Sequence, residues 1–236
     1  MGGLVSARFS AVLLAAGRGT RLHTQVPKAY IELCGKPLLC YSLERFSECD
    51  QIAQIVVVLH RDDRERCERC VEETSKRVEL VYGGEHRQDS ALAGVRAAHE
   101  EYVLVHDAAR PLVSPELIER VLEATLRHGA AVPALPVTDS LKRVREGQIV
   151  ENVDRIELVR VQTPQGFRRE LILRALQRAC AERRYFTDES GAVLALLGVQ
   201  AKIVPGDEFN LKITTSADLE LARRWLSRGE RRRPRC

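Results

Sequence analysis

The sequence predicts an α/β fold with a doubly wound, mostly parallel sheet. Short apolar runs alternate with amphipathic stretches, and several runs lack polar alternation, as expected of strands that are covered on both faces. The chain has 236 residues, of which 44% are hydrophobic, enough for the core of one large domain and too many for a disordered chain. We therefore expect one domain over residues 1–227.

The first strand is predicted at residues 9–14, where the run FSAVLL contains no charge and ends at a glycine-containing turn. IVVVL and YVLVH are similar runs further along the chain. The same pattern predicts strands at residues 55–59, 78–82, 102–106, 130–135 and 200–204.

Amphipathic stretches between these runs predict the helices. The clearest begins at Ser114, an N-cap residue that is followed by Pro115 at the first helical position and Glu116 in the first turn. The predicted helices cover residues 37–48, 62–76, 89–100, 114–128, 168–183, 188–197 and 216–226. In such an alternating fold, ligands bind at the carboxyl ends of the strands.

The alternation of strands and helices is interrupted between about residues 137 and 162. Apolar and charged residues alternate there around Glu146-Gly147, a pattern typical of an antiparallel β-hairpin. A polar arm that projects from a compact sheet offers a pairing surface, so we expect a homodimer to form through this hairpin.

The basic charge lies in a short tail. The net charge is +4, and residues 228–236, with five arginines and one glutamate, account for all of it. We predict that this tail is solvated and disordered. The neutral body argues against nucleic acid as a partner, because such binding needs a basic surface on the folded domain.

The composition also suggests where the protein works. No run approaches the ~20 apolar residues of a membrane span, and the N-terminus has no secretory signal pattern. Seven cysteines without framework spacing predict reduced thiols in a cytoplasmic protein. Cys67 and Cys70 have the C-x-x-C spacing, but with no second pair and no nearby histidine we interpret them as two thiols on one helix face.

The strongest functional signal follows the first strand. Small residues at positions 15–17 and 19 let the backbone approach a ligand closely, and consecutive N–H groups in such a turn bind anions. Arg21 and Lys28 add positive charge beside it. The dinucleotide motif G-x-G-x-x-G fails because Leu22 stands where its last glycine is required, and the Walker motif is absent.

Further polar clusters follow later strands or begin helices. Asp107 is placed to meet a metal–phosphate complex, because Mg²⁺ prefers one or two carboxylates plus phosphate oxygens. Residues 163–166 and 186–189 offer hydroxyls at predicted helix starts. The clusters lie at residues 83–90, 106–111, 163–166, 186–189 and 210–214. We expect them at one edge of the sheet.

The missing motifs narrow the chemistry. The sequence has no G-x-S-x-G nucleophile elbow, no H-E-x-x-H and no paired Cys and His signature. A site of arginine, lysine, one aspartate and a glycine turn suits phosphoryl or nucleotidyl transfer, in which the protein supplies position and countercharge.

These motifs resemble a known family. Ala15-Ala16-Gly17-x-Gly19-x-Arg21 with Pro27-Lys28 is similar to the signature of sugar-phosphate nucleotidyltransferases, which have a Rossmann-like fold. The remaining motifs make the chain similar to the 2-C-methyl-D-erythritol 4-phosphate cytidylyltransferases of the non-mevalonate isoprenoid pathway. They are Gly83-Gly84-x-x-Arg87-x-x-Ser90, His106-Asp107-Ala108-Ala109-Arg110-Pro111, Val153-Asp154-Arg155, Thr163-Pro164-Gln165, Thr187-Asp188-Glu189 and Asn210-Leu211-Lys212-Ile213-Thr214.

The resemblance implies that CTP and methylerythritol phosphate give CDP-methylerythritol and pyrophosphate, with Mg²⁺ beside Asp107 and held mainly by phosphates. The implied catalytic residues are Arg21, Lys28, Arg155 and Lys212. The implied nucleotide-binding residues are Leu14, Ala15, Ala16, Gly17, Gly19, Gly84, Arg87, Ser90, Asp107 and Ala108. The implied acceptor-binding residues are Arg110, Ser140, Arg155, Thr163, Thr187 and Lys212.

The resemblance further implies that the arm is exchanged between subunits, so that Arg155 enters the neighbouring site. Ser140 stands where the family pattern has threonine, which keeps the hydroxyl. Some members carry a following cyclase domain, whereas the sequence ends at Cys236, so we expect a stand-alone transferase. Two alternatives stay open: a ribitol-5-phosphate cytidylyltransferase, and a non-catalytic nucleotide-binding regulator.

Overall fold

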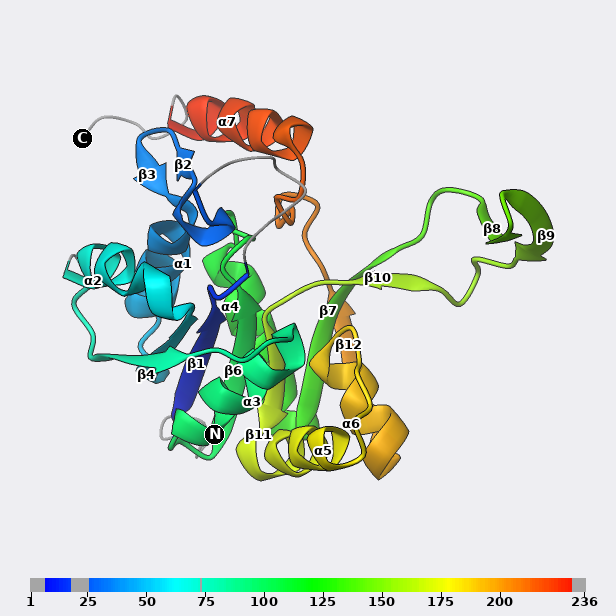
Figure 1. Ribbon diagram of the computed structural model, residues 1–236, viewed down its shortest axis with the longest axis horizontal. Coiled ribbons are helices and arrows are strands. Elements are labelled where there is room, and N and C mark those ends of the chain that lie inside the picture. The colour runs from blue at the N-terminus through cyan, green and yellow to red at the C-terminus, as the bar shows by residue number, and fades with distance from the viewer. Residues whose placement is uncertain (1–6, 18–25, 73, 231–236) are drawn as a thin grey trace, which may run out of the picture.

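A central β-sheet organises the molecule (Figure 1). The computed structural model describes residues 7–17, 26–72 and 74–230, with 228–230 as backbone only. The strands in spatial order are β10 (Val159–Val161), β7 (Ala130–Pro136), β11 (Gln165–Arg168), β6 (Tyr102–Asp107), β1 (Phe9–Leu14), β4 (Ile52–Leu59) and β5 (Val78–Tyr82), and β12 (Lys202–Pro205) also pairs with β7.

The sheet is mostly parallel, as predicted. β1 lies between β4 and β6 and runs parallel to both, and β5 continues the parallel order beyond β4. The exceptions are β11, which is antiparallel to β6 and β7, and β10, which is antiparallel to β7. The sequence prediction that a helix starts at residues 163–166 is therefore wrong: this segment enters a strand, and Gly166 is needed there because a Cβ would lie 2.0 Å from Thr125 Oγ1.

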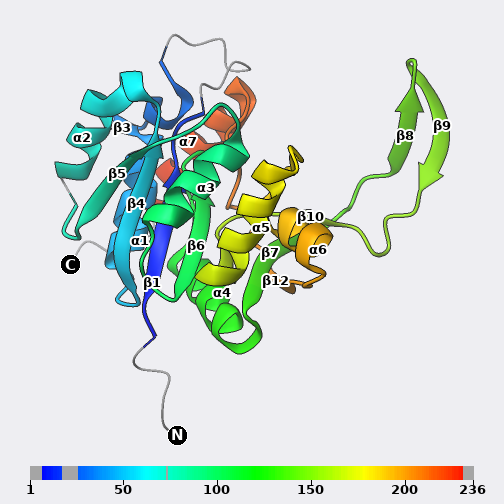
Figure 2. The same cartoon turned by 60° about the horizontal axis from the view of Figure 1, so that its bottom comes forward.

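Helices cover both faces of the sheet (Figure 2). Alternate residues of β1 enter different cores: Ala11 and Leu13 pack in the cluster that includes α4, and Val12 packs with α3 and α5. This arrangement explains why the run has no polar alternation. The α-helices are α1 (Leu38–Glu48), α2 (Arg64–Glu72), α3 (Arg87–Ala97), α4 (Pro115–His128), α5 (Arg169–Ala181), α6 (Glu189–Leu197) and α7 (Ser216–Glu230).

Helix boundaries follow the capping signals where these exist. Ser114 Oγ accepts a hydrogen bond from the N–H of Leu117 at the start of α4, as predicted. The predicted helix 62–76 is too long, because a 3₁₀ turn, η3 (Arg61–Asp63), precedes α2, which ends at Glu72. Cys67 and Cys70 lie together on the buried face of α2, as their spacing indicated.

The predicted arm is present as a projecting hairpin (Figure 1). Its strands β8 (Leu141–Arg145) and β9 (Gln148–Val153) pair antiparallel, and the turn has positive φ at both Glu146 and Gly147. The hairpin is shorter than residues 137–162, because β10 returns to pair with β7 in the main sheet.

A smaller layer lies beside the carboxyl edge of the sheet. The hairpin β2 (Glu32–Leu33) and β3 (Lys36–Pro37) follows the 3₁₀ turn η2 (Lys28–Tyr30) and shares a small core with α7. Helix α7 continues past the predicted end at residue 226, so that residues 228–230 of the predicted tail are helical. Residues 231–236 lie outside the described part, and disorder of the tail stays a prediction.

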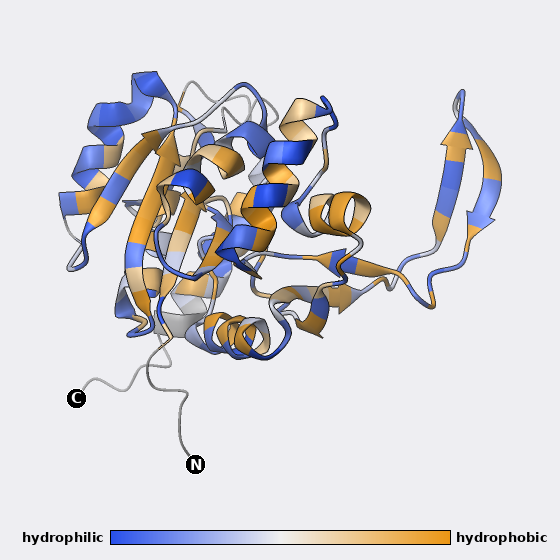
Figure 3. Ribbon diagram, turned by 90° about the horizontal axis from the view of Figure 1, so that it is seen from below, coloured by the Kyte–Doolittle hydropathy of each residue, from blue (hydrophilic) through white to orange (hydrophobic). Residues whose placement is uncertain are grey.

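Apolar residues concentrate on the strands, and polar residues on the outward faces of the helices (Figure 3). Among the described residues, no helix combines the length and apolar composition that crossing a bilayer requires.

Candidate active site

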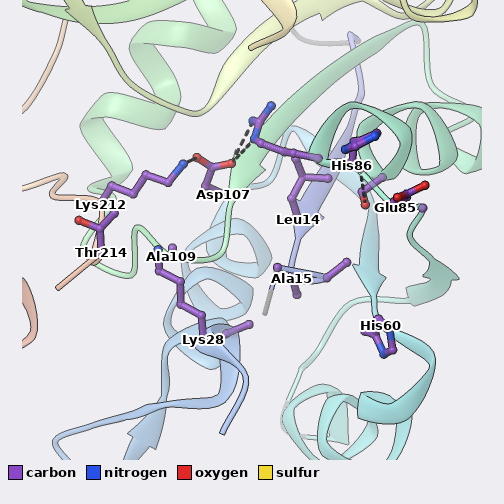
Figure 4. Close-up of a pocket in the computed structure, with 16 residues that line it drawn as sticks. Leu14, Ala15, Lys28, His60, Glu85, His86, Asp107, Ala109, Lys212 and Thr214 are labelled. Carbon is purple, nitrogen blue, oxygen red and sulfur yellow. Dashed lines mark hydrogen bonds and ion pairs between the residues drawn. The ribbon is translucent and has the colours of Figure 1, made fainter. Parts of the chain in front are cut away.

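A cavity of about 480 Å³ opens at the carboxyl ends of four parallel strands. The end of β1, the turn after β5 and the end of β6 contribute to its wall, as does η2 (Figure 4). Its lining residues are Leu14, Ala15, Ala16, Gly17, Lys28, Ala29, His60, Gly84, Glu85, His86, Arg87, Ser90, Asp107, Ala109, Lys212 and Thr214. The position agrees with the general rule for open α/β sheets.

The cavity brings together most of the predicted nucleotide site. Ten predicted residues line it, namely Leu14, Ala15, Ala16, Gly17, Lys28, Gly84, Arg87, Ser90, Asp107 and Lys212. Gly19 and Arg21 lie outside the described residues, so their predicted roles stay predictions.

Small residues allow two turns to meet at this wall. The N–H of Ala15 donates to Val58 O at 2.7 Å, which holds the first turn against β4. A Cβ on Gly83 would lie 2.7 Å from the Cβ of Ala16 and 2.6 Å from Ser90 Oγ, so that only glycine fits between the turn and α3. Helix α3 then begins at Arg87 and points its positive N-terminal end toward the cavity.

The charged centre of the cavity is Asp107, whose side chain is 9% exposed. Arg87 Nε donates to its Oδ1 at 2.9 Å, and Lys212 Nζ lies 2.7 Å from its Oδ2 (Figure 4). Burial raises the pKa of Asp107, but Arg87 and then Lys212 lower it more, so the pKa lies well below its usual range. Asp107 is therefore a carboxylate at every physiological pH.

A hydrogen-bond chain fixes the backbone around Asp107. Thr163 Oγ1 accepts from the N–H of Asp107 at 3.1 Å and lies 3.1 Å from His106 Nδ1. His106 Nε2 lies 3.2 Å from Arg110 O. Burial lowers the pKa of His106 to about 4, so the ring is neutral at pH 7. The neutral ring satisfies all partners if Nδ1 accepts from Thr163 and Nε2–H donates to Arg110 O.

The segment that carries Lys212 is tied across the end of β6. Arg110 Nη1 donates to Asn210 O at 2.7 Å, and Asn210 Nδ2 donates to Thr163 O at 2.8 Å. The N–H of Ile213 donates to Ala109 O at 2.8 Å. These bonds bring a lysine more than one hundred residues away in the sequence to the carboxylate of Asp107.

Several predicted residues do not line the cavity. Ala108 is fully buried, and Thr163 is 4% exposed with its hydroxyl bonded as described above. The structure gives Thr163 a supporting position, and its predicted contact with an acceptor stays untested. Burial lowers the pKa of Arg110, whose guanidinium bonds the backbone of Asn210.

The remaining predicted acceptor residues lie further out. Thr187 is exposed in the bend before α6. Ser140 and Arg155 are exposed on the arm, where Arg155 Nη1 donates to Thr138 O. One chain alone therefore does not bring Ser140 or Arg155 to the cavity.

Sequence reasoning did not assign a role to some lining residues. His60 directly follows β4, so the rule that ligands meet the strand ends could have identified it. Glu85, His86, Ala109 and Thr214 stand inside motifs that were recognised for their neighbours. Glu189, which bonds Arg87 at 2.7 Å, stands in the motif Thr187-Asp188-Glu189, but the motif does not indicate this partner.

The side chains of the cavity could hold a metal ion only if phosphate oxygens of a substrate supplied further ligands. Among the described residues, no three His, Cys, Asp or Glu side chains are grouped to hold an ion. The lining contains two carboxylates, the buried Asp107 and the exposed Glu85, and Mg²⁺ binds to one or two carboxylates plus phosphate oxygens.

This fold, with two lysines, an arginine and the buried Asp107 at the strand ends, is typical of a nucleotidyltransferase. The family model described as 2-C-methyl-D-erythritol 4-phosphate cytidylyltransferase matches residues 9–228. The chain therefore belongs to that family of enzymes.

Similar proteins agree. The bifunctional enzyme IspD/IspF of Rhodospirillum rubrum is 42% identical over 227 residues, which are 95% of this chain and 58% of that protein. The 2-C-methyl-D-erythritol 4-phosphate cytidylyltransferase of Caldanaerobacter subterraneus is 39% identical over 92% of this chain and 98% of its own. The chain thus spans little more than half of the first relative and nearly all of the second.

Solved structures have the same fold. The 4-diphosphocytidyl-2C-methyl-D-erythritol synthase of Anaerococcus prevotii superposes with a TM-score of 0.82 at 27% identity and covers 94% of this chain and 99% of that one. The 2-C-methyl-D-erythritol 4-phosphate cytidylyltransferase of Thermus thermophilus has a TM-score of 0.75 at 34% identity and covers 92% of this chain and 98% of that one.

Proposed function

We propose that the protein transfers CMP from CTP to 2-C-methyl-D-erythritol 4-phosphate and releases pyrophosphate. The observation that carries the proposal is the charged cluster of Arg87, Asp107 and Lys212 at the carboxyl ends of the strands, with Lys28 in the same cavity. Membership of the cytidylyltransferase family and the anion-binding turn predicted after β1 support the same reaction.

The reaction needs no general base. The attacking group is a phosphate oxygen, which is already ionised near pH 7 because the second pKa of such a phosphate is about 6. That oxygen attacks the α-phosphorus of CTP, a new P–O bond forms, and the bond to the bridging oxygen breaks so that pyrophosphate leaves with the electron pair. Two anions must approach each other, so fixed cations beside the α-phosphate lower the barrier.

Each cation has a proposed place. Lys28 and Lys212 stabilise the charge that develops around the α-phosphorus, and Arg21 joins them from the first turn. Bound Mg²⁺ would neutralise phosphate oxygens beside Asp107. The cation is part of the proposal, supported by the buried, permanently ionised Asp107.

A homodimer is part of the proposal. The arm exposes Val144, Ile149, Val150 and Ile156, apolar side chains that a second subunit would cover. In that arrangement Ser140 and Arg155 would complete the acceptor site of the neighbouring subunit, together with Arg110, Thr163, Thr187 and Lys212. A cytoplasmic location without nucleic-acid or membrane partners is also proposed, supported by six free thiols among the described residues.

The test is pyrophosphate release from CTP with each of two acceptors. We expect turnover with methylerythritol phosphate and little with ribitol 5-phosphate. The opposite preference would contradict the proposed acceptor and identify the enzyme as a ribitol-5-phosphate cytidylyltransferase.

A substitution at Lys28 tests whether the protein is an enzyme. Lys28→Ala is expected to abolish most turnover, whereas a nucleotide-binding regulator would have no turnover to lose and only weaker CTP binding. Absence of turnover with both acceptors in the unsubstituted protein, with CTP binding intact, would support the regulator.

A further inference from the structure

Glu189 is a buried carboxylate that the proposed mechanism does not use. It lies at the first position of α6, is 1% exposed, and is absent from the cavity lining. Its Oε1 accepts from Arg87 Nη1 at 2.7 Å and its Oε2 from Arg87 Nη2 at 3.2 Å. This two-bond fork fixes the plane of the guanidinium, which a single contact would leave free to turn.

Arg87 passes this constraint to Asp107. With Nη1 and Nη2 bound to Glu189, Nε donates to Asp107 Oδ1 at 2.9 Å, and Lys212 approaches the other oxygen at 2.7 Å. All three nitrogens of Arg87 thus have carboxylate partners. The predicted contact of Arg87 with the nucleotide stays a prediction, and in the structure its guanidinium holds Asp107.

The chain around Glu189 is itself held against α3. Gln88 Nε2 donates to Arg184 O at 3.0 Å, and its Oε1 accepts from the N–H of Phe186 at 3.0 Å. The N–H of Ser190 donates to Gln165 Oε1 at 3.0 Å. The start of α6 therefore keeps one position relative to Arg87, and the carboxylate is not an exposed side chain that happens to reach an arginine.

The cluster has two positive and two negative side chains, so its charges balance: Arg87 and Lys212 against Asp107 and Glu189. Burial lowers the pKa of Arg87, while Glu189 and then Asp107 raise it, and the net pKa is raised. Without Glu189, Asp107 would be the main anionic partner of Arg87. The Asp107 carboxylate would then be drawn toward the Arg87 guanidinium. A buried ion pair contributes little net stability, so fixing the geometry is the better account of its presence.

We propose that Glu189 is a positioning residue, which acts through Arg87 to hold the Asp107 carboxylate and Lys212 in place for CTP. The proposal rests on the proposed function. Because Glu189 does not line the cavity, it affects substrate only through Arg87. A merely structural role, as an acidic residue in the first turn of α6, predicts a loss of stability and no dependence on Arg87.

The test is a double-mutant cycle with Glu189→Gln and Arg87→Met, with the dissociation constant of CTP measured by calorimetry and kcat by pyrophosphate release. We expect Glu189→Gln alone to weaken CTP binding about tenfold and to weaken it less than about twofold in the Arg87→Met background. Equal factors in both backgrounds, or no effect alone, would overturn the proposal.

Asp188→Ala is the matched control. Asp188 caps the same helix by accepting from the N–H of Gly191 at 2.8 Å, and it makes no bond to Arg87. We expect it to lower the melting temperature and to leave the affinity for CTP unchanged. A loss of affinity equal to that of Glu189→Gln would assign the effect to the helix end and overturn the proposal.

Two further outcomes are distinguishable. If Glu189→Gln does not fold, Glu189→Asp, which is one methylene too short to keep both bonds, replaces it in the same cycle with the same criteria. If the unsubstituted protein binds CTP but does not transfer CMP to methylerythritol phosphate, the proposed function fails, while the cycle on CTP binding still decides the role of Glu189.

Discussion

His106 makes the stability of the fold depend on pH, and a single substitution of this residue should remove that dependence. Its ring is fully buried between Thr163 and Arg110 O, and it packs on Phe46 with ring centroids 5.1 Å apart. A protonated ring would have no acceptor for the proton on Nδ1 unless the Thr163 hydroxyl turned away from it. We propose to replace it with asparagine, whose amide oxygen can still accept from Thr163.

The magnitude follows from the two pKa values of the ring. Burial lowers the pKa of His106 from 6.5 in the unfolded chain to about 4 in the folded protein, and the neighbouring Asp107 opposes this change. The folded pKa is depressed, so the stabilisation is complete above pH 6.5 and is lost as the pH falls toward 4. Between about pH 7.5 and about pH 5 the expected loss is about 2 kcal/mol.

Urea unfolding followed by tryptophan fluorescence measures this loss, since Trp225 is the single tryptophan. The unsubstituted protein should lose about 2 kcal/mol more between about pH 7.5 and about pH 5 than His106→Asn does, whatever the variant's absolute stability. His99→Asn is the control, because the side chain of His99 is 64% exposed. Equal losses in the unsubstituted protein and in His106→Asn would refute the reasoning.

Three further outcomes are expected. Lys212→Ala should lower kcat by a factor of roughly 10² to 10³, because it removes a cation fixed beside the reacting phosphate. The control Lys202→Ala, at an exposed position on β12, should leave kcat unchanged. Steady-state kinetics of pyrophosphate release measures both variants. Gly94→Ala should cost about 1–3 kcal/mol of stability in thermal melts, because its Cβ would lie 2.3 Å from Val12 Cγ1, and an unchanged melting temperature would contradict this packing. Removing residues 231–236 should leave turnover intact, and a large loss in the pyrophosphate assay would contradict the prediction of a solvated tail.

The sequence predicted the sheet and the place of the site because both depend on local patterns. Buried parallel strands are continuous apolar runs, and the turns that follow them meet at one edge of the sheet. Ten predicted residues accordingly line one cavity. Strand β11 was missed because its four residues, Gln165–Arg168, are too short for any periodicity and follow a proline that suggests a turn.

Side-chain partners from distant parts of the chain could not be predicted in this way. Thr163 stands in a motif that predicts contact with the acceptor substrate, and this contact stays a prediction; the motif did not indicate that the hydroxyl meets His106, 57 residues away in the sequence. Glu189 meets Arg87 across 102 residues. A local pattern shows which residues follow a strand, but the direction in which a hydroxyl or carboxylate points depends on packing between elements that are far apart in the chain.

The cluster at Asp107 explains why a protein would bury two carboxylates beside a site for polyanions. Free cations at such a wall would repel each other and move between rotamers, so each would have to be ordered when the substrate binds. Asp107 and Glu189 hold Arg87 and Lys212 at fixed positions before any ligand arrives. Charges that are already in place need no reorganisation as the transition state forms, and this gain appears in rate and affinity more than in stability. Neutralising Glu189 should therefore impair CTP binding more than its effect on the melting temperature would suggest.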